Sequence, residues 1–218
     1  MGRLTYIILL PILLSASLAI YATLAGRRSW VYLFKPLTTI LILLLALALP
    51  ADPPGRYRLG VLIGLLLSLA GDIFLMLPGD RFIAGVVAFL GAHLAYLAAF
   101  TSVVPFAASP AAFAAVAVAV IALLSVLWGS LPSPMRAPLV IYAVVLGSMT
   151  AQAVSQWTVL QSAAAGAGAI GAVLFLASDT TLVIDRFARP FRLAPLFVLG
   201  TYYTAQVLIA LSLGVTAP

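Results

Sequence analysis

Long apolar stretches, separated by short polar connections, constrain this chain more than any other feature of its sequence. A helix needs about 20 apolar residues to cross the hydrocarbon core of a membrane. Of the 218 residues 65% are hydrophobic and 7% are charged, whereas about a quarter of a soluble domain is charged. We therefore expect an all-α, polytopic integral membrane protein, one transmembrane domain over residues 1–218. The eight expected helices are 4–24, 32–50, 58–77, 82–100, 110–128, 137–156, 163–184 and 193–214.

The composition also excludes several kinds of functional site. There is no Cys and only one His, which excludes disulfides, thiol catalysis, Cys-ligated metals and any site with several histidines. The net charge of +6 is spread singly between apolar runs, so it indicates membrane topology rather than a nucleic-acid partner. We expect neither a metal nor a cofactor.

Arginines are unevenly divided between the connections. Seven lie in the loops after the first, third, fifth and seventh expected helices, against three at the termini and in the other loops. Because basic loops stay in the cytoplasm, we expect a multi-pass protein of the inner membrane with odd-numbered loops inside and both termini outside. The seven are Arg27, Arg28, Arg81, Arg136, Arg186, Arg189 and Arg192, and the three are Arg3, Arg56 and Arg58.

The two halves of the chain echo each other. The segment 64–72 resembles 171–179, both ending in Asp, and Asp-Arg-Phe follows each, at 80–82 and 185–187. An offset of four helices preserves orientation, which predicts two parallel repeats, at about 1–105 and 106–218. Asp72 and Asp179 would then face each other across a central cavity.

Ionisable residues inside a membrane cost about 2.5–3.5 kcal/mol each on insertion scales, so each requires a reason. Asp72, Asp179 and Lys35 lie near the cytoplasmic ends of their expected helices. The other internal polar residues lie near the middle of theirs, which predicts one cavity opening toward the inner leaflet. They are His93, Tyr96, Tyr202, Tyr203 and Gln206.

Structural explanations compete with a functional one. Lys35 reaches the interface if its side chain snorkels, or it forms a purely structural ion pair with Asp72. A single buried His93 is more often a helix-packing residue than a ligand or base. Asp72 and Asp179 resist such explanations best, because neither has a basic partner one turn away on its own helix.

Five short motifs resemble those of the YhhN family, which includes the eukaryotic transmembrane lysoplasmalogenases. They cover most of the chain, in order, and Phe89 adds to them. The motifs are Lys35-Pro36-Leu37-Thr38-Thr39, Gly71-Asp72-Ile73-Phe74-Leu75-Met76, Ala92-His93-Leu94-Ala95-Tyr96, Ala177-Ser178-Asp179 and Tyr202-Tyr203-Thr204-Ala205-Gln206. The resemblance implies a membrane hydrolase that cleaves the vinyl-ether bond of lysoplasmalogens, releasing a fatty aldehyde and glycerophosphoethanolamine or glycerophosphocholine.

The polar residues suit that reaction. Protonation of the β-carbon of a vinyl ether gives an oxocarbenium ion, which water attacks. Two carboxyl groups in a poorly solvated cavity can divide the roles, one protonated and one ionised. We expect Asp72 and Asp179 to donate the proton and activate water jointly, without a metal, and Lys35 to hold the lipid phosphate. The residues expected to bind the water and the glycerol hydroxyl are His93, Tyr96, Tyr202 and Gln206, with Tyr203 also facing the cavity.

Two other functions fit the same composition. A small proton-coupled transporter would also combine parallel repeats with buried carboxylates, but polar residues would continue through the outer half, where Gln152, Gln156 and Gln161 are the only hint. A packing subunit of a larger complex would carry polar residues facing outward. The expected partners are a lysophospholipid substrate and the surrounding membrane lipids.

Overall fold

A computed structural model describes residues 3–49 and 55–215. Asp52, which follows the second expected helix in the sequence, lies outside the described residues. Within them, eight helices are long and apolar enough to cross a membrane, which confirms the all-α membrane fold. They are α1 (Arg3–Leu24), α2 (Arg28–Ala48), α3 (Gly55–Met76), α4 (Phe82–Thr101), α5 (Pro110–Leu127), α6 (Ser133–Leu160), α7 (Ala163–Val183) and α8 (Ala194–Leu211). Short 3-10 or π turns follow three of them, namely η1 (Trp128–Ser130), η2 (Ile184–Ala188) and η3 (Ser212–Gly214).

Local capping explains where several helices begin and end. Ser109 and Ser162 precede α5 and α7, and each side chain accepts a hydrogen bond from a backbone N–H of the first turn. The largest difference from expectation is α6, predicted at 137–156 but longer at both ends. Pro134 is tolerated in its first turn, where the missing N–H costs nothing, and Gln161 ends the helix with a left-handed φ of 48°.

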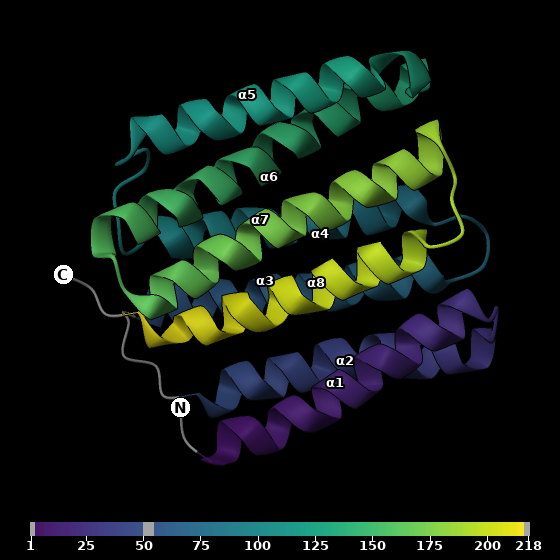
Figure 1. Cartoon of the computed structure of the whole chain (residues 1–218), viewed down its shortest axis with the longest axis horizontal. Coiled ribbons are helices and arrows are strands. Elements are labelled where there is room, and N and C mark those ends of the chain that lie inside the picture. The colour runs from purple at the N-terminus through teal and green to yellow at the C-terminus, as the bar shows by residue number, and fades with distance from the viewer. Residues whose placement is uncertain (1–2, 50–54, 216–218) are drawn as a thin grey trace.

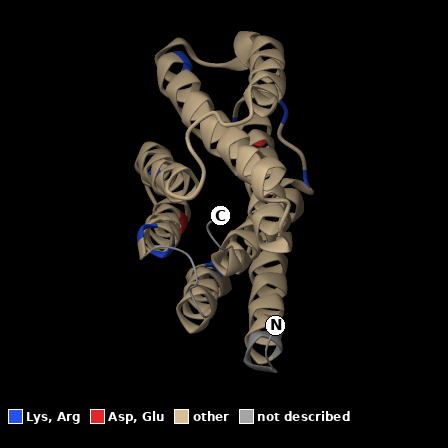
Figure 2. Ribbon diagram, turned by 90° about the vertical axis from the view of Figure 1, so that its left-hand side faces the viewer, with Lys and Arg blue, Asp and Glu red and all other residues tan. Residues whose placement is uncertain are grey.

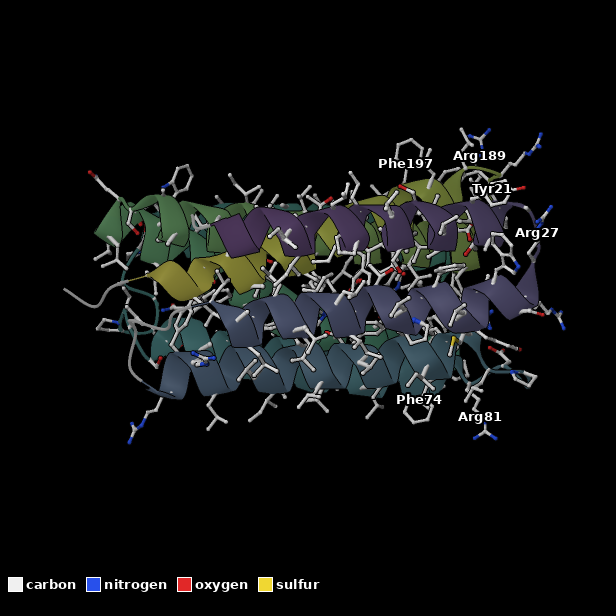
Figure 3. All side chains as sticks on the ribbon, turned by 90° about the horizontal axis from the view of Figure 1, so that it is seen from below. Tyr21, Arg27, Phe74, Arg81, Arg189 and Phe197 are labelled. Atoms are coloured by element: carbon white, nitrogen blue, oxygen red, sulfur yellow. The ribbon has the colours of Figure 1, made fainter. Side chains whose placement is uncertain are left out.

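The helices run roughly antiparallel to their neighbours in one elongated bundle (Figure 1). Connections after α1, α3, α5 and α7 lie at one end, on the right in Figure 1, and both termini lie toward the other. Arg27, Arg81 and Arg189 lie together at that end in Figure 3, and we call it the arginine-rich end. Along the remaining ribbon charged residues are rare (Figure 2).

Glycines allow two pairs of helices to approach closely. A Cβ atom at Gly64 of α3 would lie 2.2 Å from the ring of Tyr96 on α4, and one at Gly60 would lie 2.8 Å from the carbonyl oxygen of Ala95. On α7, a Cβ atom at Gly171 would lie 2.9 Å from the carbonyl oxygen of Ala205 on α8. Small residues drive such contacts between membrane helices because they permit dense packing.

The packing of the two halves corresponds. In the first half α2 contacts α3 and also α8 of the second half, while α6 contacts α7 and also α4 of the first. The tightly packed pair α3–α4 likewise corresponds to α7–α8. These matching neighbours support two parallel four-helix repeats, which we retain as a proposal.

We predict that Gly171→Ala destabilises the protein by roughly 1–3 kcal/mol, because the added methyl group meets helix backbone that cannot rotate away. The matched control is Gly200→Ala on α8, where a Cβ atom meets nothing within 4 Å and removing a helical glycine should be neutral or slightly stabilising. Thermal unfolding of the purified proteins in detergent measures both. Equal melting temperatures for the two variants would contradict the close α7–α8 contact.

Candidate functional site

Asp72 is the centre of a buried polar network between α2, α3 and α8. Its side chain forms an ion pair with Lys35, whose Nζ lies 3.5 Å from Oδ1. Thr39 and Tyr202 donate hydrogen bonds to Oδ2 at 2.6 and 2.7 Å. All three contacts donate to the carboxylate, which is the arrangement that an ionised carboxylate needs. Asp72 is 1% exposed, so its carboxylate is buried.

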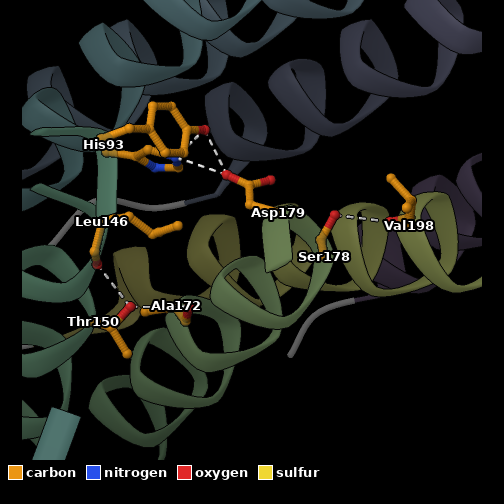
Figure 4. Close-up of polar contacts among 8 residues, drawn as sticks. His93, Leu146, Thr150, Ala172, Ser178, Asp179 and Val198 are labelled. Atoms are coloured by element: carbon orange, nitrogen blue, oxygen red, sulfur yellow. Dashed lines mark hydrogen bonds and ion pairs between the residues drawn. The ribbon is translucent and has the colours of Figure 1, made fainter. Parts of the chain in front are cut away.

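Asp179 is the centre of a second network, between α4, α6 and α7 (Figure 4). The Tyr142 hydroxyl donates to Oδ2 at 2.5 Å. His93 Nε2 lies 3.2 Å from the same oxygen and 2.9 Å from the Tyr142 hydroxyl. Among the described residues no donor contacts Oδ1. Asp179 therefore keeps one oxygen available, and the residue is 9% exposed.

The two carboxylates occupy corresponding places in the two halves. Met76 ends α3 four residues after Asp72, and Val183 ends α7 four residues after Asp179. Tyr202 on α8 follows Gly200 by two residues, as His93 on α4 follows Gly91. Each carboxylate thus accepts contacts from its own half and from a helix of the other half.

The correspondence fails at the cation. At the offset that aligns Asp72 with Asp179, Lys35 corresponds to Tyr142, whose hydroxyl donates to Asp179. Asp72 is therefore paired with a lysine, whereas Asp179 faces a tyrosine and a histidine. The two networks have the same framework and different charge.

Among the residues that the structure describes, there is no open cavity between the two carboxylates of the kind that the sequence predicted. Phe89 and Phe175 pack in an edge-on cluster against Tyr202, with ring centroids 5.4–6.2 Å apart. Phe175 also contacts the His93 ring at 4.7 Å. Aromatic side chains therefore fill the space between the donors of the two networks, because an apolar bundle excludes any void that it can close.

A cavity of about 310 Å³ lies instead at the arginine-rich end, above both networks. Leu75 and Leu182 line it, one helical turn beyond Asp72 and Asp179, and Lys35 also reaches it. The two Asp-Arg-Phe segments meet at its rim, where Arg186 donates to Asp80 at 2.6 Å. One cavity therefore opens over both carboxylates.

The remaining residues predicted for this cavity lie deeper in the bundle. The Tyr96 hydroxyl donates to Gln206 Oε1 at 2.6 Å, one turn below Tyr202. Tyr203 is buried, and its hydroxyl has no hydrogen-bond partner among the described residues. These three residues support the walls of the site rather than line the cavity.

Sequence reasoning missed Tyr142 and gave Thr39 no role. Tyr142 lies among apolar residues of α6. In the sequence nothing but its hydroxyl set it apart from residues that only pack against a neighbouring helix or lie at the interface. Thr39 lies one turn after Lys35 on α2, a spacing that places both on one helix face. That spacing was the available signal for Thr39.

Two of the three outer glutamines have structural contacts. Gln152 bonds to the carbonyl oxygen of Val104 and to the N–H of Ala107, which ties the α4–α5 connection to α6. Gln161 ends α6. The amide of Gln156 is buried without a hydrogen-bond partner among the described residues.

The model of the YhhN family matches residues 30–213, which span both carboxylates and all their donors. The chain belongs to the YhhN family. No solved structure matches it.

Curated relatives of this YhhN-family chain come from animals and bacteria. It is 37% identical to a protein named lysoplasmalogenase TMEM86B of Sus scrofa, over 85% of this chain and 76% of the relative. It is 34% identical to the lysoplasmalogenase of Mycobacterium bovis, over 76% and 64%. The membrane protein YhhN of Escherichia coli is 29% identical over 94% and 97%.

We predict that Lys35→Met destabilises the protein by on the order of 3 kcal/mol, because it leaves the Asp72 carboxylate buried without its cation. The double variant Lys35→Met/Asp72→Asn should recover much of that loss, since the neutral amide needs no counter-charge. Thermal unfolding in detergent measures this cycle. If the two changes are additive, the ion pair contributes nothing to stability.

Proposed function

We propose that this chain is an integral membrane lysoplasmalogenase, which hydrolyses the vinyl-ether bond of a lysoplasmalogen without a metal. The observation on which the proposal rests is the pair of buried carboxyl groups, each one turn below a cavity that a lysine also lines. Membership of the YhhN family and the names of the animal and mycobacterial relatives support it.

The reaction is slow without an acid at the correct carbon. A proton must pass from a carboxylic acid to the β-carbon, leaving an oxocarbenium ion beside the new carboxylate. Water adds to this ion and returns a proton to the carboxylate, which forms a hemiacetal. The hemiacetal hydroxyl then gives its proton to the departing glycerol oxygen, so that a fatty aldehyde and a glycerophospho-alcohol leave. General acid catalysis of this kind contributes about 10²–10⁴-fold.

The polar end of the substrate suits the cavity. Lys35 is 9% exposed and lines its floor, where the ammonium can face both Asp72 and a lipid phosphate. Arg81 also lines the cavity and adds positive charge at the rim. We propose that the arginine-rich end faces the cytoplasm, as the distribution of arginines favours, and that the substrate enters from the inner leaflet.

The outer half of the bundle distinguishes a transporter from a hydrolase, because a transporter needs polar residues there. Buried polar residues do occur there, since the Tyr57 hydroxyl lies 2.7 Å from that of Ser212 and Gln156 is buried. However, Gln152 holds a loop and Gln161 ends a helix. Fewer polar residues are therefore left for a transport path through the outer half. The hydrolase is therefore the better-supported function.

We predict that Asp72→Asn and Asp179→Asn each lower aldehyde release roughly a hundredfold or more, while the proteins still elute as folded species. Asp52→Asn, in the loop expected after the second helix, is the matched carboxylate-to-amide control and should retain activity. The assay uses purified protein in detergent with lyso-alkenyl-glycerophosphoethanolamine and follows the aldehyde.

Two outcomes would contradict this proposal. If the folded Asp72→Asn and Asp179→Asn proteins both show normal turnover, neither carboxyl group takes part in the chemistry. A folded wild-type protein that releases no aldehyde would remove the activity itself. Proton-dependent flux of intact lysolipid in vesicles would then favour the transporter.

A further inference from the structure

Three neighbouring hollows form a path from the cavity past Asp179. The cavity shares Leu75, Phe82 and Leu182 with a narrow passage of about 20 Å³. Asp179 and Tyr142 line that passage and also line a third hollow, of about 40 Å³. Shared walls place the three hollows in sequence, with Asp179 at the junction of the second and third.

The third hollow is an apolar groove between α5, α6 and α7. Its walls include Leu124 of α5, Ala143 of α6 and Leu176 of α7. Asp179 is the only charged residue among those that line it. The path therefore changes from a polar cavity with a lysine to an apolar groove, with one carboxyl group at the boundary.

The polarity of a lysoplasmalogen falls in the same order along the molecule, from the phosphate headgroup through the vinyl ether to the hydrocarbon chain. We propose, on the basis of the function proposed above, that the alkenyl chain occupies the α5–α7 groove and that Asp179 donates the proton to its β-carbon. This arrangement places the reacting bond at Asp179 while the headgroup stays in the cavity near Lys35.

The surroundings of the two carboxyl groups support the assignment of the donor. Asp72 receives three donated contacts, one from a lysine ammonium, and it is not among the residues that line the three hollows. In the described part of the chain, Asp179 contacts a tyrosine and a histidine through Oδ2 alone, and the residue lines two of the three hollows. Asp179 is therefore the carboxyl group that a substrate in these hollows can reach.

The groove lies at the edge of the bundle, where α5 is the outermost helix (Figure 1). Of its described residues only Ala112, Val120 and Leu127 are buried. The passage is narrow, so entry of a chain requires Leu75 and Leu182 to change rotamer. Both are flexible side chains at helix ends, where such changes are inexpensive.

In the proposed step the O–H bond of Asp179 breaks and its proton forms a C–H bond with the π electrons of the β-carbon. The carboxylate remains beside the oxocarbenium ion, which water then attacks. The proton that this water loses restores Asp179 to its acid form. The residue is therefore regenerated without any other reactant.

The first test alters the groove. Ala143→Phe projects a ring into it and should lower kcat/KM for a long-chain alkenyl substrate by roughly tenfold relative to a short-chain one, the equivalent of about two displaced methylene groups. Ala115→Phe, on the exposed face of α5, is the matched control and should leave that ratio unchanged. An unchanged ratio in a folded, active Ala143→Phe protein would overturn the chain site.

The second test identifies the donor. Asp179→Ala should regain aldehyde release in proportion to the concentration of added undissociated formic acid, since a small acid can replace the lost carboxyl group. Asp72→Ala, with no need of an added proton donor, should not show this dependence. Rescue of Asp72→Ala instead would transfer the donor role to Asp72 and overturn the assignment.

The two proposals fail in different ways. If wild-type protein releases no aldehyde, the hydrolase itself is wrong. If the wild type is active but both tests above give the contrary result, the hydrolase stands, and ordinary membrane lipid or detergent is the occupant of the groove.

Discussion

Placing two carboxyl groups inside an apolar bundle is the constraint on which the rest of this structure depends. A buried charge or polar group is costly unless donors surround it, and these donors must come from several helices at once. The contacts of Asp72 come from side chains of α2 and α8, and those of Asp179 come from side chains of α4 and α6. The contacts from α8 and α4 also join the two halves of the chain, so the bonds that surround the carboxyl groups also hold the bundle together.

Correspondence between the halves provides two similar frameworks with different electrostatics. A lysine completes one, whereas a tyrosine and a histidine complete the other. Different surroundings allow two carboxyl groups to take different roles in acid–base chemistry. The proposed hydrolase uses that difference, with the cavity at the arginine-rich end giving access to both sites.

Much of the fold followed from the sequence because hydrophobicity and length determine membrane helices almost directly. The expected and observed boundaries of α1, α4 and α5 differ by only one residue at any end. The ends of α6 were misjudged by about four residues, since Pro134 begins a helix there and Gln161 ends one by a left-handed turn. Asp72, Asp179 and Lys35 were also predictable, because a charge within an apolar run is conspicuous and costly.

The sequence by itself therefore determined the class of fold, the distribution of arginines and the ionisable residues that need an explanation. Tertiary structure alone decided that Tyr142 and His93 contact Asp179, that Phe89 and Phe175 fill the space between the sites, and that Tyr96 and Gln206 bond to each other below them. The physical reason is that each contact joins different helices. Periodicity shows which face of a helix a residue occupies, but the neighbour of that face depends on how all the helices pack.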